Sequence, residues 1–405
     1  MRENQTYLLF ATRIIRLFCY GFLSVVLALY LIEKGLTESQ IGLLFTLTLA
    51  GDAIISLYLT TSADRFGRKR TLIIGALLMF AAGIAFIVTN NVAILMAAAI
   101  IGVISPSGNE IGPFLSVEQA GLTQVVPNKT RTNVFAWYNL VGSFATALGA
   151  LAGGWLAQFL QTEGWSALAA YRVVLSGYAL GGLILAVLFL SLSETIEVHG
   201  TVSTDIKRVL GLHRSKSVVM HLSALFALDA FAGGLLIQSM IAYWFHVKFE
   251  VDSGILGSIF FGANILAGIS ALLAVKLASK IGLINTMVFT HIPSNILLML
   301  VPLMPSLPLA IGLLLLRFSI SQMDVPTRQS YTMSVVAPDE RSAASGVTAI
   351  ARSVGASLSP ALTGIFFANP ALFSLPFFLS GGLKIIYDLS LYRSFSVIKP
   401  PEEVA

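Results

Sequence analysis

Long runs of apolar residues alternate with short polar segments along the whole chain. A run of about 20 mostly apolar residues is long enough to cross a lipid bilayer as an α-helix. Twelve runs have about that length or more, at residues 7–32, 39–61, 71–89, 92–124, 131–158, 171–192, 218–246, 253–278, 284–303, 307–336, 342–367 and 370–393. The pattern therefore predicts an all-α membrane protein with twelve transmembrane helices.

Polar residues mark the points where several of these helices begin. Thr37 and Gln40 have the spacing of a capping box, in which each side chain bonds to the backbone of the other residue. Asn90 and Asn91 are a turn signal between two apolar runs. Pro338 stands where a helix can start, because proline is tolerated in the first turn.

The composition agrees with a membrane location. Of the 405 residues, 56% are hydrophobic and 11% are charged, whereas a soluble domain has about 45–50% apolar and about 25% charged residues. The single cysteine, Cys19, excludes an intrachain disulfide framework and a cysteine-rich metal site. Arg13 and Arg16 inside the first run favour a retained first helix over a cleaved signal peptide.

The net charge of +5 reflects topology and needs no nucleic-acid partner. If both termini face the cytoplasm, the inner segments contain sixteen Lys and Arg residues and the outer loops contain three, Lys34, Arg172 and Lys248. The inner residues are Arg2, Arg65, Arg68, Lys69, Arg70, Lys129, Arg131, Lys207, Arg208, Arg214, Lys216, Lys276, Lys280, Arg341, Arg393 and Lys399. This positive-inside bias predicts a multi-pass protein of the plasma (inner) membrane with both termini in the cytoplasm.

The two halves of the chain repeat one another. A shift of 210 positions aligns residues 118–131 with residues 328–341, so that the fourth and tenth helices correspond. We therefore expect two pseudo-symmetric six-helix bundles, at residues 1–193 and 218–405, joined by a cytoplasmic linker at residues 194–217. Transporters built from repeated halves bind their solute at the interface between the repeats.

A motif lies in the loop between the second and third helices, which reads TTSADRFGRKR from Thr60 to Arg70. It resembles the G-x-x-x-D-R-x-G-R-R/K signature of the major facilitator superfamily, with Thr60 in place of the usual glycine. The resemblance covers essentially the whole chain, through twelve spans, the central linker and a weaker echo at Lys280 and Gly282. It implies the fold of that superfamily and transport by alternating access.

The resemblance also implies a gate at this loop. In the family, the aspartate of the signature engages an arginine of the eleventh helix, and Arg352 and Arg341 are the candidates here. Alternatively, the basic residues of the loop are topology anchors that contact anionic lipids. The expected gating residues are Asp64, Arg65, Gly67, Arg68 and Arg352.

The fifth helix matches the family's antiporter motif, G-P-x-x-G-G, in part. Gly149, Gly153 and Gly154 are present, but Ala150 takes the place of the proline. Two interpretations therefore stay open, a functional hinge and close helix packing through small residues.

Twelve ionisable residues lie in the interior of the predicted spans, away from their ends, where charge is costly and marks a functional site by default. They are Arg13, Arg16, Asp52, Glu110, Glu118, Asp229, Arg317, Asp324, Arg328, Arg352, Lys384 and Asp388. Eight of them fall on the first, fourth, seventh and tenth helices, which line the central cavity in the superfamily that the chain resembles.

The spacing of polar residues on the tenth helix refines this picture. Arg317, Ser321, Asp324, Arg328 and Tyr331 follow a helical repeat and predict one polar stripe that faces water. Prolines near the charges permit helix breaks where backbone groups can meet a ligand, at Pro106 and Pro113 around Glu110 and at Pro326. The expected solute and proton cavity comprises Arg16, Asp52, Glu110, Asp229, Arg317, Asp324, Arg328 and Tyr331.

Internal ion pairs are the alternative role for these charges, because six are acidic and six are basic. Lys384 and Asp388, one helical turn apart on the last helix, are expected to pair with each other. Among the carboxylates, Asp229 or Glu110 is the expected proton carrier, and His291 is expected to serve packing.

We interpret the chain as a monomeric secondary-active transporter that exports a small solute in exchange for protons, without an enzymatic step, a cofactor or a bound metal. No phosphate-binding loop of the G-x-x-x-x-G-K-S/T kind and no G-x-S-x-G or H-E-x-x-H motif occurs. Two rivals keep the fold, namely a proton-coupled importer of a sugar or organic anion and a divalent-metal transporter. The metal ligands of the second rival would be Asp52, Glu110, Asp229, Asp324 and His291.

Overall fold

The computed structural model describes residues 2–110, 112–127, 131–193, 196–197, 212–337 and 339–397. The predicted linker at residues 194–217 lies mostly outside these ranges. The side chains of Asp64 and Arg65 also lie outside the described part.

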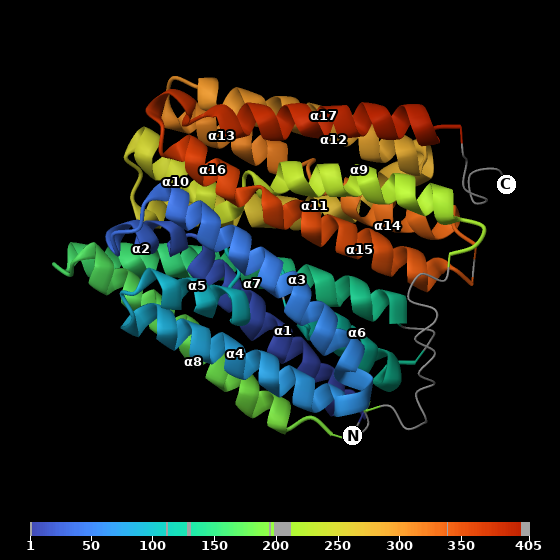
Figure 1. Ribbon diagram of the computed structural model, residues 1–405, viewed down its shortest axis with the longest axis horizontal. Coiled ribbons are helices and arrows are strands. Elements are labelled where there is room, and N and C mark those ends of the chain that lie inside the picture. Colours follow the sequence, from blue (N-terminus) through green and yellow to red (C-terminus); the bar gives the residue numbers. More distant parts are fainter. Residues whose placement is uncertain are drawn as a thin grey trace. The chain divides into compact units, whose positions relative to one another are not determined.

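Helices account for all twelve predicted spans. The first half contains α1 (Arg2–Ser24), α2 (Leu27–Glu33), α3 (Glu38–Phe66), α4 (Arg68–Val88), α5 (Val92–Ile101), α6 (Phe114–Val125), α7 (Arg131–Thr162) and α8 (Ala167–Leu190). The second half contains α9 (Lys216–Gly234), α10 (Gln238–Phe249), α11 (Ser253–Ile281), α12 (Leu283–Leu300), η3 (Val301–Leu303), α13 (Leu307–Phe318), α14 (Asp324–Ser334), α15 (Arg341–Leu358), α16 (Pro360–Phe367), η4 (Pro370–Leu372) and α17 (Leu375–Phe395). Figure 1 shows their order along the chain.

Ten helical segments are long and apolar enough to cross a membrane within the described residues, and Val92–Ile101 and Leu307–Phe318 are shorter apolar helices. The prediction of a polytopic α-helical membrane protein is therefore confirmed. The expected signals at Thr37 and Asn91 are also present, whereas Pro338 lies outside the described residues. Thr37 Oγ1 accepts the Gln40 N–H at 3.3 Å, and Gln40 Oε1 accepts the Thr37 N–H at 3.0 Å. Asn91 accepts the N–H groups of Ala93 and Ile94 at the start of α5.

Five of the spans are broken, including the first, fourth, seventh and tenth. The breaks lie at residues 25–26, 102–113, 235–237, 319–323 and 359. The break at 102–113 contains Pro106 and Pro113, as the sequence predicts. Pro326 instead lies in the first turn of α14, and the tenth span breaks upstream of it. A first turn tolerates proline because its N–H would have no helical partner there.

The chain divides into two compact units. Unit 1 comprises Met1–Ser203 and Ile237–Gly262, and unit 2 comprises Thr204–Leu236 and Ala263–Ala405. The seventh span is therefore shared, because α9 belongs to unit 2 and α10 belongs to unit 1. The domain limits predicted at residues 193 and 218 stay a prediction.

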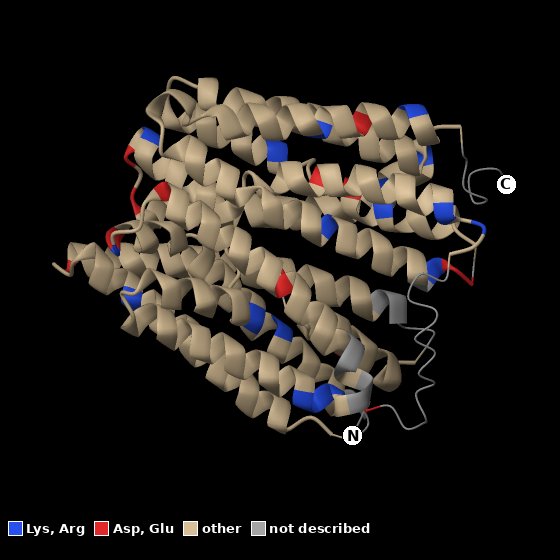
Figure 2. Cartoon of the chain, in the orientation of Figure 1, with Lys and Arg blue, Asp and Glu red and all other residues tan. Residues whose placement is uncertain are grey.

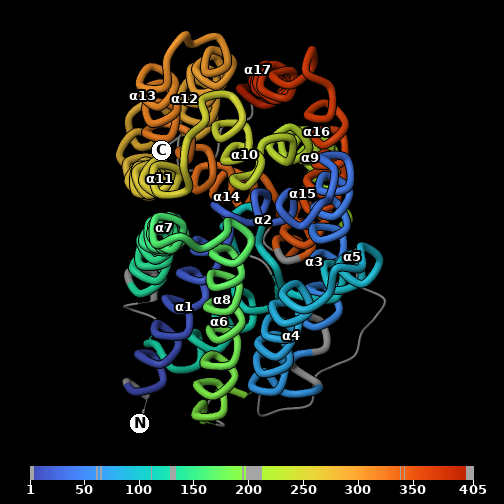
Figure 3. Tube along the Cα trace, turned by 90° about the vertical axis from the view of Figure 1, so that its left-hand side faces the viewer, coloured from blue at the N-terminus to red at the C-terminus, as the bar shows by residue number. Residues whose placement is uncertain are grey.

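Unit 1 is held together by close helix contacts. In this unit α1 packs along α7, and α8 lies between α4 and α7 (Figure 3). The approach is tightest at glycines, since a Cβ at Gly149 or Gly153 would stand 2.0 or 2.1 Å from the carbonyl oxygen of Phe18 or Phe22. These glycines of the partial antiporter motif thus serve the close packing of α7 on α1.

The carbonyl groups released by the breaks in unit 1 are satisfied by α10. Ser239 Oγ donates to the carbonyl oxygens of Ser24 and Pro106, at 2.6 Å in each case. The Ser239 N–H also donates to Pro106 O at 3.1 Å. Gln238 Nε2 donates to Ser24 Oγ at 2.7 Å, and Tyr243 Oη donates to Glu38 Oε1 at 2.8 Å. Three interrupted spans therefore meet at one polar junction inside the unit.

Unit 2 has its own apolar core. Helix α9 packs against α15 and α17, and α12 runs beside α17 (Figure 1). Leu222, Phe226, Met287, Tyr331 and Tyr387 form part of this core.

Candidate functional site

Charged residues occur along several helices of both units (Figure 2). In unit 1 they form an arginine–glutamate cluster of Arg13, Arg16, Glu110 and Glu118. Arg16 is fully buried and donates through Nη1 and Nη2 to the two oxygens of Glu118, at 2.7 Å each. Arg16 Nε and Arg13 Nη1 each donate to one oxygen of Glu110, at 2.8 Å. Two positive charges thus meet two negative charges in a buried, hydrogen-bonded arrangement.

Uncharged side chains complete the arginine–glutamate cluster. Thr12 Oγ1 donates to Glu118 Oε1 at 2.9 Å, and the Tyr138 hydroxyl donates to Glu118 Oε2. Arg13 Nη2 donates to Asn139 Oδ1 at 3.3 Å, and its guanidinium lies over the Tyr138 ring. The sequence analysis did not single out Thr12, Tyr138 or Asn139. Thr12 could have been found from its place one helical turn before Arg16, whereas no spacing signal marks the two residues on α7.

The break in the fourth span brings Glu110 into this cluster. Glu110 lies in the non-helical stretch between α5 and α6, whereas Glu118 lies on α6 itself. Gly108 and Gly112 flank Glu110 with φ values of 70° and 77°, a region that residues with a Cβ rarely adopt. The glycines therefore permit the turn that directs Glu110 toward α1.

Asp52 on α3 differs from the other intramembrane acids. Its Oδ1 accepts the backbone N–H of Gly112 at 2.5 Å and the hydroxyl of Ser56 at 3.1 Å. The ion pairs of the described residues include none made by Asp52. Asp52 is thus a carboxylate without a basic partner that is bound directly to the break carrying Glu110.

Unit 2 contains a second group of charges, the Asp229 cluster, formed by Asp229, Asp324, Arg328, Arg352 and Lys384. Asp229 accepts Lys384 Nζ at 2.6 Å, Arg352 Nη1 at 3.0 Å and Arg328 Nη1 at 3.3 Å. Arg328 also donates to Asp324 at 2.6 Å. The cluster holds three bases and two acids, and the Arg352 side chain, 34% exposed, is its most accessible member.

The last helix corrects the expected pairing of Lys384 with Asp388. Lys384 reaches Asp229 on α9, whereas Asp388 accepts His291 Nδ1 at 2.8 Å and Asn295 Nδ2 at 3.2 Å. His291 therefore forms a polar contact with Asp388 in addition to the packing expected of it. Neighbouring helices offer these two residues more direct partners than the next turn of their own helix does.

The expected polar stripe on the tenth span is not a continuous helical face, because residues 319–323 interrupt it. Asp324 and Arg328 join the Asp229 cluster and are buried. Tyr331 is fully buried in the core of unit 2 and donates to the carbonyl oxygen of Phe395 at 3.2 Å. The Tyr331 side chain thus packs in the apolar core, and its place in a solute cavity stays a prediction. Arg317 stands apart from both.

The signature loop builds a capped helix start. Gly67 has φ of 98°, and the Glu197 carboxylate accepts the N–H groups of Arg68 and Lys69 at 2.7 and 3.0 Å. Arg68 is buried, and its Nη1 donates to the carbonyl oxygens of Ala120 and Ile196. Arg68 therefore ties helix ends together within unit 1 and is not a lipid anchor.

The gate expected from the family signature stays a prediction. The Asp64 side chain lies outside the described residues, and Arg352 pairs with Asp229 in its own unit. Arg341 is exposed. Next to it, Glu340 accepts backbone N–H groups of His213, Arg214 and Ser215 at the start of α9. These hydrogen bonds lower the pKa of Glu340 to about 2, and the bond from His213 contributes most.

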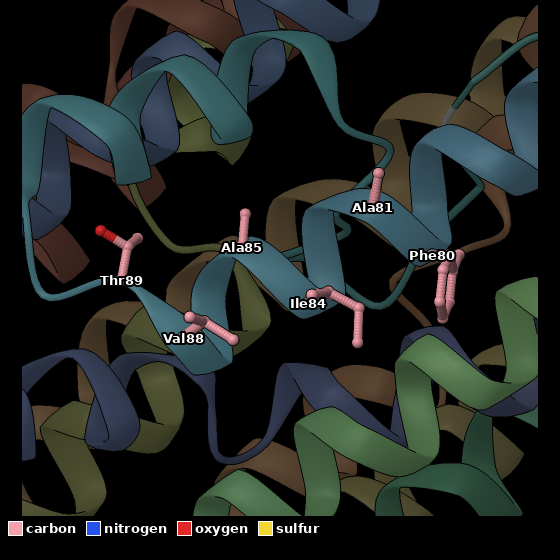
Figure 4. A pocket seen from close by; sticks show the side chains of 6 residues that line it. All are labelled: Phe80, Ala81, Ile84, Ala85, Val88 and Thr89. Carbon is pink, nitrogen blue, oxygen red and sulfur yellow. The ribbon is translucent and has the colours of Figure 1, made fainter.

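No group of three or more His, Cys, Asp or Glu side chains that could hold a metal ion occurs within the described ranges. The divalent-metal rival therefore has no ligand set in this part of the chain. A groove along the end of α4 is apolar apart from one hydroxyl, and it offers no titratable group to a solute. Its lining residues are Phe80, Ala81, Ile84, Ala85, Val88 and Thr89 (Figure 4).

A family model described as Major Facilitator Superfamily matches residues 9–360. The chain belongs to the major facilitator superfamily. It is also 32% identical to an uncharacterized membrane protein of Saccharomyces cerevisiae, over 96% of this chain and 93% of the yeast protein. The quinolone resistance protein NorA of Staphylococcus aureus is 27% identical over 156 residues, which cover 38% of this chain and 39% of NorA.

Solved structures of superfamily transporters share the fold. A bacterial homologue of the human lysosomal transporter Spinster, in an inward-facing and occupied conformation, superimposes with a TM-score of 0.75 at 18% identity, over 98% of each chain. A D-xylose–proton symporter gives a TM-score of 0.76 at 16% identity, over 99% of each chain. The twelve-helix superfamily fold predicted from the sequence is therefore confirmed, and the chain is a multi-pass membrane protein of a transporter family.

Proposed function

We propose that the chain exports a small solute in exchange for protons by alternating access, and that Asp52 is the carboxylate that carries the proton. The observation that carries this proposal is the contrast among the six intramembrane acids. Five of them contact a base, at distances of 2.6 to 3.3 Å. Asp52 contacts no base among the described residues.

An unpaired charge in the membrane interior is costly, and binding a proton removes that charge. Glu110 and Asp229, the carriers expected from the sequence, have two and three bases around them. Nearby cations stabilise the charged form of a carboxylate and therefore disfavour the binding of a proton. The geometry therefore favours Asp52 over both.

The hydrogen bond from the Gly112 N–H links the proposed proton carrier, Asp52, to the break that carries Glu110. Asp52 as a carboxylate holds the break at residues 102–113 through the Gly112 N–H. A protonated carboxyl group is a weaker acceptor than a charged one. Proton binding would thus loosen the link between α3 and the break that presents Glu110 to Arg13 and Arg16.

The proposed direction is export. It is supported by the similarity to NorA, whose name records quinolone resistance, although the match spans 39% of that protein. The cytoplasmic termini are supported by the sixteen-to-three distribution of Lys and Arg, and the plasma membrane is the proposed location. A reporter fused after residue 405 tests the orientation, because only a cytoplasmic C-terminus gives fluorescence with green fluorescent protein and no activity with alkaline phosphatase.

The test of proton coupling uses purified protein in liposomes that contain a pH-sensitive dye. Solutes are added one at a time, and each transported solute should move protons in the opposite direction and be recovered chemically unchanged by mass spectrometry. Asp52→Asn should keep solute binding and lose the proton flux. Glu163→Gln, which makes the same acid-to-amide change at an exposed position, should behave as wild type.

Proton flux that persists in Asp52→Asn would reject Asp52 as the carrier. Solute uptake along an inward proton gradient would instead favour the importer of a sugar or organic anion. Chemical conversion of the solute would show an enzymatic step and contradict a purely transporting role.

A further inference from the structure

Arg317 is a guanidinium without a partner. It lies in the last turn of α13, immediately before the break at residues 319–323. None of the hydrogen bonds or ion pairs among the described residues involves its side chain, and its Nε is buried without an acceptor. Its guanidinium carbon lies over the Phe318 ring, 4.9 Å from the ring centre.

The other intramembrane bases are all paired. Arg13 and Arg16 contact Glu110, Arg328 contacts Asp324, and Arg352 and Lys384 contact Asp229, at 2.6 to 3.0 Å. The protein thus pairs each of these five bases with a carboxylate and leaves Arg317 without one. An unpaired base at this depth is costly, so its presence calls for a compensating anion.

The position of Arg317 fits a site for a solute. Arg317 is ten residues from Leu307, the first residue of α13, which places it about 15 Å along the helix and close to the middle of a hydrocarbon core of about 30 Å. It shares a helical face with the buried residues Ala310 and Leu314. At this depth, the phosphate groups of lipids are out of reach.

Ser321, in the break that follows, supports the same site. Its side chain is 5% exposed, and its Oγ also has no partner among the described residues. Two polar groups four residues apart are therefore both unsatisfied. Buried polar groups without partners are rare in folded proteins, and a bound ligand is one way to satisfy them.

The charge balance of unit 2 points to the sign of the ligand. Four intramembrane bases, Arg317, Arg328, Arg352 and Lys384, stand against three acids, Asp229, Asp324 and Asp388. The acids are already engaged by bases, Asp388 by His291. The Asp229 cluster holds one base more than acids, and Arg317 adds a further positive charge that contacts no acid among the described residues.

We propose that Arg317 binds an anionic group of the transported solute, a carboxylate, sulfonate or phosphate carried on an organic scaffold. The proposal rests on the proposed transport function and names the class of its substrate. The guanidinium fork can donate two parallel hydrogen bonds to such a group. Among the described residues, Arg317 is the one base in the interior of a span that contacts no carboxylate.

The first experiment needs no ligand. It compares the thermal unfolding of the purified full chain with that of Arg317→Gln and Arg16→Gln. Removing a half-buried charge that has no carboxylate partner should leave the melting temperature unchanged or raise it, whereas removing Arg16 should lower it, because Glu118 then loses its base. A fall in Arg317→Gln as large as that in Arg16→Gln would overturn the proposal, since Arg317 would then have a structural partner.

The second experiment uses one scaffold with different head groups. Binding of 2-naphthoate, 2-naphthalenesulfonate and 2-naphthyl phosphate is compared with that of the neutral 2-naphthamide. We expect wild type to bind at least one anion more tightly than the amide. Arg317→Gln should weaken the binding of that anion about 10- to 100-fold, as expected for lost charge-assisted hydrogen bonds. Its affinity for the amide should not change.

Arg317→Lys guards against a misfolded variant, because it keeps the charge and should retain part of the anion preference. The proposal is overturned if no anion binds wild type more tightly than the amide, or if Arg317→Gln weakens anion and amide equally. Asp52→Asn separates the two proposals. Loss of its proton flux with an intact anion preference supports both, whereas a normal proton flux with an intact anion preference removes only the assignment of Asp52.

Discussion

Glu118 is the residue whose removal should cost the most stability. Its Oε1 accepts Arg16 Nη1 at 2.7 Å and Thr12 Oγ1 at 2.9 Å, and its Oε2 accepts Arg16 Nη2 at 2.7 Å and the Tyr138 hydroxyl. Both residues of the Arg16–Glu118 pair are 0% exposed. Glu118→Gln removes the negative charge and turns one acceptor into a donor that faces other donors. Arg16 then depends on Glu110 alone, which Arg13 shares.

Breaking a buried ion pair by removing one partner typically costs about 3–5 kcal/mol, and we expect Glu118→Gln to fall in that range. Unfolding in mixed micelles with increasing sodium dodecyl sulfate measures the loss, with the fluorescence of the four tryptophans as the signal. Glu163→Gln, an exposed acid-to-amide change, is the matched control and should remain close to wild type.

A double variant makes the test specific to the pair. Replacing a whole buried ion pair by apolar residues is often neutral or stabilising. Arg16→Met together with Glu118→Leu should therefore be more stable than Glu118→Gln alone. A loss below about 1 kcal/mol in Glu118→Gln, well under the range for a broken buried pair, would refute this account of the cluster. A double variant no better than the single one would refute it as well.

Three further outcomes follow from the described contacts. Glu340→Gln should lower the melting temperature near pH 7. The folded pKa of about 2 lies below the usual value of about 4.3. The charged Glu340 therefore contributes its full stabilisation above about pH 4.3. The difference in melting temperature between wild type and variant should disappear as the pH falls from about 4.3 toward 2. Gly149→Ala should destabilise strongly because its Cβ would stand 2.0 Å from Phe18 O, whereas Gly312→Ala, with nothing within 4 Å, should not; equal melting temperatures would contradict the tight packing. Tyr331→Phe should cost about 1 kcal/mol, the usual net worth of one hydrogen bond, and leave transport unchanged; a transport defect without a stability loss would return Tyr331 to the cavity.

Hydropathy was enough to predict the helices, because a bilayer demands a fixed length of apolar chain. The broken fourth span was also predictable, since Pro106 and Pro113 cannot donate backbone hydrogen bonds. The break at residues 235–237 was not. It reads Leu-Leu-Ile, three residues that suit a helix interior, and its conformation is supported by bonds from Ser239 to Ser24 and Pro106, which lie far away in sequence.

The sequence identified the charged residues but not their partners. Lys384 and Asp388 have ideal spacing for a pair on one helix, yet each finds its partner on another helix. Tyr138 carries no charge and follows no polar stripe, so its bond to Glu118 depends on how α7 packs on α1. Spacing describes one helix at a time, whereas these contacts depend on the packing of several.

The division of the seventh and eighth spans between the units has a consequence for how the chain can be taken apart. Residues 237–262, a helical hairpin, belong to unit 1, yet the peptide chain continues into unit 2 at both of their ends. Unit 1 therefore keeps this hairpin only through non-covalent contacts, such as those of Ser239 and Tyr243. A protease cut between residues 198 and 211 would sever the peptide that joins the two halves of the chain. The hairpin would stay covalently attached to the second fragment. The two fragments should then purify together as a complex, because the hairpin of the second fragment binds the first fragment non-covalently.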